Sequence, residues 1–155
     1  MLYSYFYETP VGQIQITENG AAIISINFPG ESCYPDAQNY ETDLLRKTAG
    51  QLKEFFEGRR KEFDLPLAPA GTPFMEKVWD QLQKINYGET CSYKDIAGAI
   101  ENPKAVRAVG MANHRNPIPI IIPCHRVIGA NGSLVGYGGG LPMKKFLLDL
   151  EKSNA

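Results

Sequence analysis

The 155-residue sequence is poor in the residues that build metal centres and disulfide frameworks. It has only two histidines, His114 and His125, and three cysteines, Cys33, Cys91 and Cys124, with no Cys-x-x-Cys spacing. An odd number of unpaired cysteines argues against a disulfide scaffold and a zinc ribbon, and favours a reducing, cytoplasmic compartment. Two histidines provide few nitrogen ligands, so we expect no protein-held metal and no other cofactor.

The sequence also lacks a long hydrophobic run. No apolar stretch approaches the ~20 residues that a membrane-spanning helix needs. Residues 1–8 include the acidic Glu8 and no basic residue, which is not typical of a signal peptide. With 43% hydrophobic and 21% charged residues, the composition is that of a globular protein that buries a core and does not enter a membrane.

One long segment contains no acidic residue. Residues 1–71 carry 6 Lys and Arg against 10 Asp and Glu, whereas residues 72–155 carry 10 against 7. Within the second part, residues 102–148 have no Asp or Glu, and their basic residues are Lys104, Arg107, Arg115, Arg126, Lys144 and Lys145. Such a segment attracts a polyanion. The alternative is a basic face that arose by coincidence.

The N-terminal part predicts a small antiparallel sheet and one helix. Three segments have strand-like patterns, namely residues 3–7, 13–17 and 24–28. Asn19-Gly20 indicates a hairpin turn between the second and third. A helix is predicted over residues 40–57, ended by Gly58, with an inward face of Leu45, Ala49, Leu52 and Phe56. Residues 65–71 contain two prolines and a glycine and predict an extended linker, so residues 1–71 form the first domain.

The second part, residues 72–155, predicts mostly helices. Thr72-Pro73 gives an N-cap and an N1 proline for a helix whose inward residues are Phe74, Val78, Leu82 and Ile85. Trp79 lies beside that face, and we expect it in the core.

Two shorter helices follow. Ser92 and Asp95 form a capping box, and Asn102-Pro103 is expected to cap a helix over residues 104–113, with Val106 and Val109 inward and Arg107 outward. Two short helices with bases on the second have the outline of a helix-turn-helix.

A thiol, an imidazole and a guanidinium stand in consecutive positions after an apolar run. Residues 118–122 read Ile-Pro-Ile-Ile-Ile, and Pro123 leads into Cys124, His125 and Arg126. A free cysteine has a pKa near ~8.5, and a neighbouring histidine or positive charge lowers that pKa and increases the thiolate fraction. The alternative is a cysteine that packs in the core as a small hydrophobic residue.

The segment beyond the thiol is rich in glycine. Residues 136–140 read Gly-Tyr-Gly-Gly-Gly. Such a loop lets the backbone approach a flat ligand closely, although a flexible surface loop has the same composition. A last helix is predicted from Pro142, with an apolar side of Phe146, Leu147 and Leu150. Glu151 lies near its end, where the helix dipole disfavours an anion, so this acid is a candidate for orienting a histidine.

Together these motifs resemble one family closely, the O6-alkylguanine-DNA alkyltransferases (methylated-DNA–protein-cysteine methyltransferases). The resemblance covers about residues 72–151. It rests on Ile122-Pro123-Cys124-His125-Arg126-Val127, in which Pro-Cys-His-Arg-Val is a highly specific signature. It also rests on Ser92-Tyr93, Arg107-Ala108-Val109-Gly110, Asn116-Pro117, Gly136-Tyr137, Gly139-Gly140 and Leu147-Leu148 with Glu151. It implies an α+β protein, with a ribonuclease-H-like N-terminal domain of three antiparallel strands and a helix, followed by a mostly helical DNA-binding domain with a helix-turn-helix.

The resemblance implies a single-turnover transfer of an alkyl group from DNA to the protein. Cys124 corresponds to the irreversible acceptor of the group on O6-alkylguanine, with O4-alkylthymine as a further candidate substrate. His125 is expected to take the thiol proton through a water while Glu151 orients its ring. Asn116 corresponds to the hinge between recognition helix and active-site segment. Tyr93 corresponds to the residue that contacts the flipped guanine and helps to protonate it.

The same resemblance implies that the partner is double-stranded DNA, bound through its minor groove. A base inside the duplex cannot reach a buried thiol, so the alkylated nucleotide must be flipped out. Arg107 corresponds to the finger that fills its space, and Ala105 and Ala108 are small enough for close approach to DNA. The other residues expected to contact DNA or the flipped base are Arg115, Arg126, Val127, Tyr137, Gly138, Gly139 and Lys144. We expect a monomer with little sequence specificity, and cooperative binding stays open.

The sequence departs from the family in two respects, and two other functions compete. Position 138 is glycine where some members carry serine, which leaves the range of alkyl groups open. The zinc ligands and the metal-binding regulatory domain of some members are not recognisable, which is typical of a constitutive, stand-alone member. One competing function is lesion binding without repair, but such proteins replace the acceptor cysteine. The other is an unrelated Cys-His hydrolase, which would leave the basic helix pair unexplained.

Overall fold

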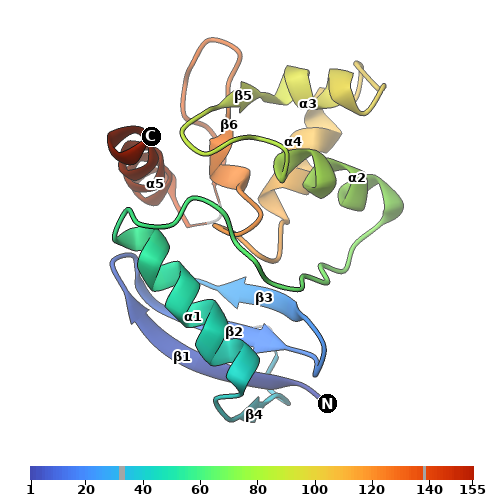
Figure 1. Ribbon diagram of the computed structural model, residues 1–155. Helices are drawn as coiled ribbons and strands as arrows, with labels where there is room; N and C mark the ends of the chain where they lie inside the picture. Colours follow the sequence, from blue (N-terminus) through green and yellow to red (C-terminus); the bar gives the residue numbers. More distant parts are fainter. Residues whose placement is uncertain (32–33, 138) are drawn as a thin grey trace. The chain divides into compact units, whose positions relative to one another are not determined.

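The computed structural model describes residues 1–31, 34–137 and 139–155. The chain forms two compact units, Met1–Ala70 and Gly71–Ala155. The first unit contains a sheet and one helix, and the second unit contains the remaining helices (Figure 1). The fold is therefore α+β, as the sequence predicts.

Three antiparallel strands form the body of the first unit, in agreement with the alternating patterns: β1 (Tyr3–Thr9), β2 (Gly12–Glu18) and β3 (Ile23–Asn27). Thr9 stabilises the first turn, because its hydroxyl donates to the Gly12 carbonyl at 2.6 Å. Asn19 stabilises the second turn, because its Oδ1 accepts from two backbone amides. A fourth strand, β4 (Gln38–Asn39), pairs in parallel with β1. Two residues show no periodicity, so this strand could not be predicted.

The helix α1 (Asp43–Phe56) packs against β1 and β2 on one face of the sheet (Figure 1). Thr42 begins it, because its hydroxyl accepts from the backbone amide of Leu45 at 3.2 Å. Gly58 follows its end with a φ of 76°, a conformation that favours glycine. The start lies three residues later than predicted, since the N-cap is Thr42 rather than a residue before Tyr40.

The buried face of α1 differs by one position from the predicted face. Its members include Leu45, Thr48, Leu52 and Phe55. Ala49 and Phe56, which were expected to lie inward, are only half-buried. Apolar residues at two adjacent positions flank the same stripe, so the helical period alone did not choose between Phe55 and Phe56.

The predicted linker lies beside β3 in extended conformation. The backbone amide of Ile23 donates to the carbonyl of Pro66 at 2.9 Å, and the amide of Ala68 donates to the carbonyl of Ile23 at 2.8 Å. These two bonds attach the end of the first unit to its own sheet. The sequence prediction put the domain boundary just beyond this segment, after residue 71.

In its described residues, the second unit has four α-helices and one pair of parallel strands. The helices are α2 (Pro73–Leu82), α3 (Tyr93–Ala99), α4 (Val106–His114) and α5 (Leu141–Asn154), and the strands are β5 (Cys91–Ser92) and β6 (Val127–Ile128). Both α2 and α3 pack against α4 (Figure 1). Trp79 is buried where they meet, and its Nε1 donates to the carbonyl of Ala112 at 2.8 Å. The placement of Trp79 in the core is confirmed.

Local capping signals positioned two of these helices correctly. Thr72 caps α2 in front of Pro73, and Ser92 caps α3 in a capping box with Asp95. The expected cap at Asn102 is wrong, because α4 begins at Val106 and has no side-chain cap. Val106 is 37% exposed instead of inward. It is the first residue of α4, where the preceding turn decides how the side chain points.

Within the ranges that the structure describes, no helix is long and apolar enough to cross a bilayer. The same residues contain no cluster of three His, Cys, Asp or Glu side chains that could hold a metal ion.

Candidate active site

Cys124 lies in a tight helical turn inside the second unit. A single 3-10 turn, η1 (Cys124–Arg126), follows Pro123 and leads directly into β6. The run of residues 118–122 folds as buried irregular chain in front of it, with Ile118, Ile120 and Ile122 fully buried. The thiol-bearing residue itself is only 5% exposed. The apolar run therefore places the thiol in a site that excludes most water.

Two asparagines connect the end of α4 to the thiol segment. The Nδ2 of Asn113 donates to the carbonyl of Cys124 at 3.3 Å. The Nδ2 of Asn116 donates to the carbonyl of Ile122 at 2.7 Å, while its Oδ1 accepts from the amide of Ile118 at 3.0 Å. All these atoms are buried, so their loss would leave unpaired polar groups in the core. The contacts place Asn116 between helix and thiol, where the hinge was expected.

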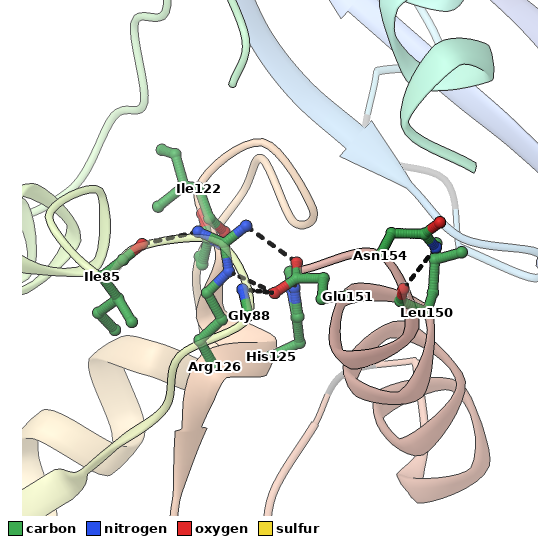
Figure 2. A network of polar contacts seen from close by, with 9 residues as sticks. Ile85, Gly88, Ile122, His125, Arg126, Leu150, Glu151 and Asn154 are labelled. Carbon is green, nitrogen blue, oxygen red and sulfur yellow. Dashed lines mark hydrogen bonds and ion pairs between the residues drawn. The ribbon is translucent and has the colours of Figure 1, made fainter. Parts of the chain in front are cut away.

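A buried carboxylate holds both residues that follow the thiol. The Oε2 of Glu151 lies 2.6 Å from His125 Nε2 and 2.9 Å from an Arg126 terminal nitrogen, and its Oε1 lies 2.8 Å from Arg126 Nε (Figure 2). The backbone amide of Gly88 donates to Oε1 at 3.2 Å. The second terminal nitrogen of Arg126 donates to the carbonyl of Ile85 at 2.7 Å (Figure 2). The carboxylate of Glu151, on α5, thus accepts hydrogen bonds from two residues of η1 and from one backbone amide in the loop after α2.

This network fixes the proton positions on the histidine ring. Burial raises the pKa of Glu151, but the hydrogen bonds and charges of His125 and Arg126 outweigh it and lower the pKa to about 2. The carboxylate is therefore ionised and only accepts, so His125 Nε2 carries the proton. Burial lowers the pKa of His125 despite the opposing effect of Glu151, which keeps the ring neutral. Its Nδ1 holds a lone pair and has no hydrogen-bond partner in the described part of the chain.

The thiol needs such a base. Burial raises the pKa of Cys124 to about 11, although a hydrogen bond from Asn116 and the charge of Lys144 act in the opposite direction. At neutral pH the thiol is therefore protonated. The sequence-based expectation that Arg126 would lower this pKa is not met, because its guanidinium is bound to Glu151.

Tyr93 lies near the thiol and contacts the segment that precedes the glycine-rich residues. The Tyr93 hydroxyl donates to the carbonyl of Val135 at 2.9 Å. Burial raises the pKa of Tyr93, and the charge of Cys124 acts in the same direction, so the phenol stays protonated. Tyr137 is buried and Gly139 is half-buried. Gly138, also expected in this loop, lies outside the described residues.

The residues expected to contact DNA occupy different environments. Arg107 and Ala108 are exposed on α4, Ala105 is half-buried just before it, and Arg115 is exposed just after it. Val127 is buried in β6, so only its backbone could contact a base. The exposed surface of α4 thus carries the small Ala108 beside the basic Arg107, and Arg115 follows the end of the helix.

Both parts of the chain match models of one family. Residues 1–69 match the model described as "6-O-methylguanine DNA methyltransferase, ribonuclease-like domain", and residues 73–153 match the model of the DNA binding domain of the same family. The chain belongs to the 6-O-methylguanine DNA methyltransferase family.

Relatives in this methyltransferase family are similar over almost their whole length. A methylated-DNA–protein-cysteine methyltransferase of Methanosarcina mazei is 57% identical, over 99% of both chains. The Bacillus subtilis protein of that name, of the constitutive type, is 46% identical over 98% of this chain and 96% of its own. Among solved structures, Mycobacterium tuberculosis OGT in complex with DNA is 41% identical with a TM-score of 0.93, over 99% of this chain and 94% of that one.

Two basic residues in this family member do not lie where a DNA contact was expected. Arg126 is 6% exposed and bound to Glu151, and its guanidinium lies 5.7 Å from the centre of the Tyr87 ring. Lys144 is fully buried and donates to backbone carbonyls. Both side chains are bound to protein groups in the interior, so the structure gives neither of them an exposed position for a contact with DNA. A basic residue in an acid-poor segment gives the same sequence signal whether it faces solvent or a carboxylate outside that segment.

Sequence reasoning did not select two residues of the methyltransferase site. Asn113 contacts the Cys124 backbone, and Gly88 contributes its amide to Glu151. The signal for Asn113 was present, since it precedes Asn116 by three residues and such neighbours share one side of a helix end. Gly88 gave no signal beyond its role in ending a helix. It has a φ of 80°, which favours glycine and presents its amide to the carboxylate.

Proposed function

We propose that this chain repairs DNA by transferring the alkyl group of O6-alkylguanine to Sγ of Cys124. The proposal rests most directly on one observation: His125, which is buried, held by Glu151 through Nε2 and unpartnered at Nδ1 among the described residues, directly follows the buried, protonated Cys124 in the turn η1. The family membership and the named activity of the relatives support it. The DNA-bound relative supports duplex DNA as the partner.

In the proposed reaction a sulfur–carbon bond forms as the carbon–oxygen bond to guanine breaks. His125 accepts the thiol proton at Nδ1 through a bridging water, and Glu151 stabilises the imidazolium that results. The electron pair of the broken bond stays on the guanine, which takes a proton from Tyr93, and the proton that left the thiol then restores the Tyr93 phenol. The neutral state of Tyr93 supports this role, although its hydroxyl must leave the Val135 carbonyl to reach the base. The thioether has no route back to a thiol, so each molecule acts once.

Access of the base to the thiol requires flipping. Cys124 is 5% exposed, so an alkyl group stacked inside a duplex cannot approach its sulfur. We propose that Arg107, exposed on α4, fills the space that the base leaves. The loop around Tyr137 would then lie against the flipped base. We also propose that the protein acts in the cytoplasm, because a free acceptor thiol needs a reducing compartment.

The test uses two single-cysteine replacements in the full chain. Cys124→Ala should abolish transfer of a labelled methyl group from an O6-methylguanine duplex while binding of that duplex persists. The matched control is Cys91→Ala, because Cys91 is a free, half-buried cysteine of the same unit. It should transfer the label fully. Transfer by Cys124→Ala, or its loss in Cys91→Ala alone, would exclude Cys124 as the acceptor.

A further inference from the structure

Lys144 is a fully buried lysine next to the thiol, and the proposed reaction gives it no role. Its side chain, on α5, has no exposed surface. The ammonium donates to the carbonyl of Val127 at 2.5 Å and to that of Val135 at 2.8 Å. Its nitrogen also lies 6.0 Å from the centre of the Tyr93 ring. A buried lysine is rare because the charge must leave water, so this placement calls for a reason.

The two carbonyls belong to segments on either side of the site. Val127 directly follows the turn that carries Cys124. Val135 directly precedes the glycine-rich loop, and its carbonyl also accepts from Tyr93. One ammonium therefore connects the thiol segment, the loop and the ring that we expect to contact guanine. Gly136 lies within the same group of contacts, since a side chain there would meet the Tyr93 hydroxyl at 3.5 Å.

Among the charged groups near Cys124, Lys144 differs from the others because no carboxylate neutralises it in the described part of the chain. Tyr93 on α3 and His125 on η1 are neutral, for the reasons given above. Arg126 on η1 and Glu151 on α5 neutralise one another in an ion pair. Among the described residues, Lys144 forms no ion pair with a carboxylate, and the charge of Cys124 raises its pKa against the larger effect of burial. It is thus the positive charge that remains available to a thiolate.

We propose that Lys144 is a positioning residue for alkyl transfer, whose ammonium holds the glycine-rich loop to the thiol segment and compensates the negative charge that develops on Cys124. This role rests on the proposed function, since it assumes that the thiol loses its proton during the reaction. An uncompensated thiolate in a buried site would be strongly disfavoured. The thioether that forms is neutral, so transfer removes the negative charge on sulfur that the Lys144 ammonium compensates.

The test measures the thiol directly and needs no DNA. Iodoacetamide alkylates thiolates, so its rate at Cys124 as a function of pH, followed by peptide mapping, gives the pKa of that thiol. Lys144→Met removes the charge at similar length and should raise this pKa by about one unit, which lowers the rate near neutral pH about tenfold. Lys144→Arg keeps the charge and should recover part of the rate. The control, Lys145→Met, alters a side chain that is 66% exposed and paired with Asp149, and should change nothing.

The outcomes separate this inference from the proposed function. A Lys144→Met protein whose rate falls equally at every pH, with no shift of the pKa, would show a purely structural lysine. A wild-type protein that fails to repair O6-methylguanine would refute the proposed function, whatever the variants do. If Lys144→Met does not fold, nuclear magnetic resonance of lysine side chains in the wild-type protein decides. Lys144 should titrate together with the Cys124 thiol at alkaline pH, and alkylation of Cys124 should remove that coupling; an unchanged titration curve of Lys144 would overturn the proposal.

Discussion

Glu151 is the carboxylate on which the buried network depends, and a neutral replacement tests it quantitatively. Four hydrogen bonds converge on it, from His125, two nitrogens of Arg126 and the Gly88 amide. Burial raises its pKa, but the hydrogen bonds and charges of His125 and Arg126 outweigh this and lower the pKa from 4.5 to about 2. A difference of about 2.5 units corresponds to about 3 kcal/mol of folding free energy. We therefore expect Glu151→Gln to lower the free energy of unfolding by about 3 kcal/mol at neutral pH.

The loss of unfolding free energy in Glu151→Gln should become smaller as the pH falls. Because the folded-state pKa of Glu151 lies below the unfolded-state value, its contribution is fully present above about pH 4.5 and disappears as the pH falls toward about 2. The difference in unfolding free energy between wild type and Glu151→Gln should be largest near neutral pH. It should shrink steadily in acid, where the wild-type carboxylate takes up a proton.

The chain contains its own probe for this measurement. Trp79 is the single tryptophan and is buried in the second unit, so its fluorescence during urea unfolding reports on the unit that holds Glu151. Asp149→Asn is the matched control, because this carboxylate on the same helix is exposed and pairs with the exposed Lys145. Its effect should stay within about 1 kcal/mol. A Glu151→Gln loss below about 1 kcal/mol, or an equal loss at pH 7 and pH 3, would refute the reasoning.

Three further variants test other parts of the site. Arg107→Ala should slow repair of duplex DNA at least about tenfold more than reaction with free O6-benzylguanine, because only the duplex requires flipping; equal losses would make Arg107 merely structural. Asn116→Leu removes a hydrogen bond to the thiol and should raise the pKa of Cys124 further, which an iodoacetamide pH profile would detect; an unchanged profile would contradict the contact. Trp79→Phe removes the indole donor of the Ala112 carbonyl, which still accepts from the Arg115 amide, and should cost about 0.5–1.5 kcal/mol in thermal unfolding, whereas a neutral effect would show that the bond is replaced.

The sequence predicts best those features that arise from neighbouring residues. The strands β1 to β3 follow from alternation and turn chemistry, and the starts of α2 and α3 follow from Thr72 and Ser92. The placement of Cys124, His125 and Glu151 in one site came from the family resemblance. Adjacency in the chain did not imply it, since His125 points to Glu151 on α5 and not directly to the thiol.

Features that depend on distant residues were not predicted. The pairing of β5 with β6 joins two-residue segments that have no period of their own. Arg126 is bound by a carboxylate that lies just beyond the acid-free segment, so local charge counting assigned it to DNA. Lys144 was assigned to DNA for a similar reason, because its partners are backbone carbonyls, which a sequence pattern does not reveal. Tertiary structure decides which basic residues face solvent.

Mass spectrometry of the intact protein, mixed with excess duplex containing O6-methylguanine, tests the proposed reaction most directly. Tryptic cleavage after Arg115 and Arg126 isolates Cys124 in a peptide without Cys33 or Cys91. We expect each molecule to gain one methyl group in place of the thiol hydrogen, on that peptide, and then to stop. Methyl transfer to another residue, repeated turnover, or no gain in mass by folded protein that still binds the lesion would contradict irreversible repair at Cys124.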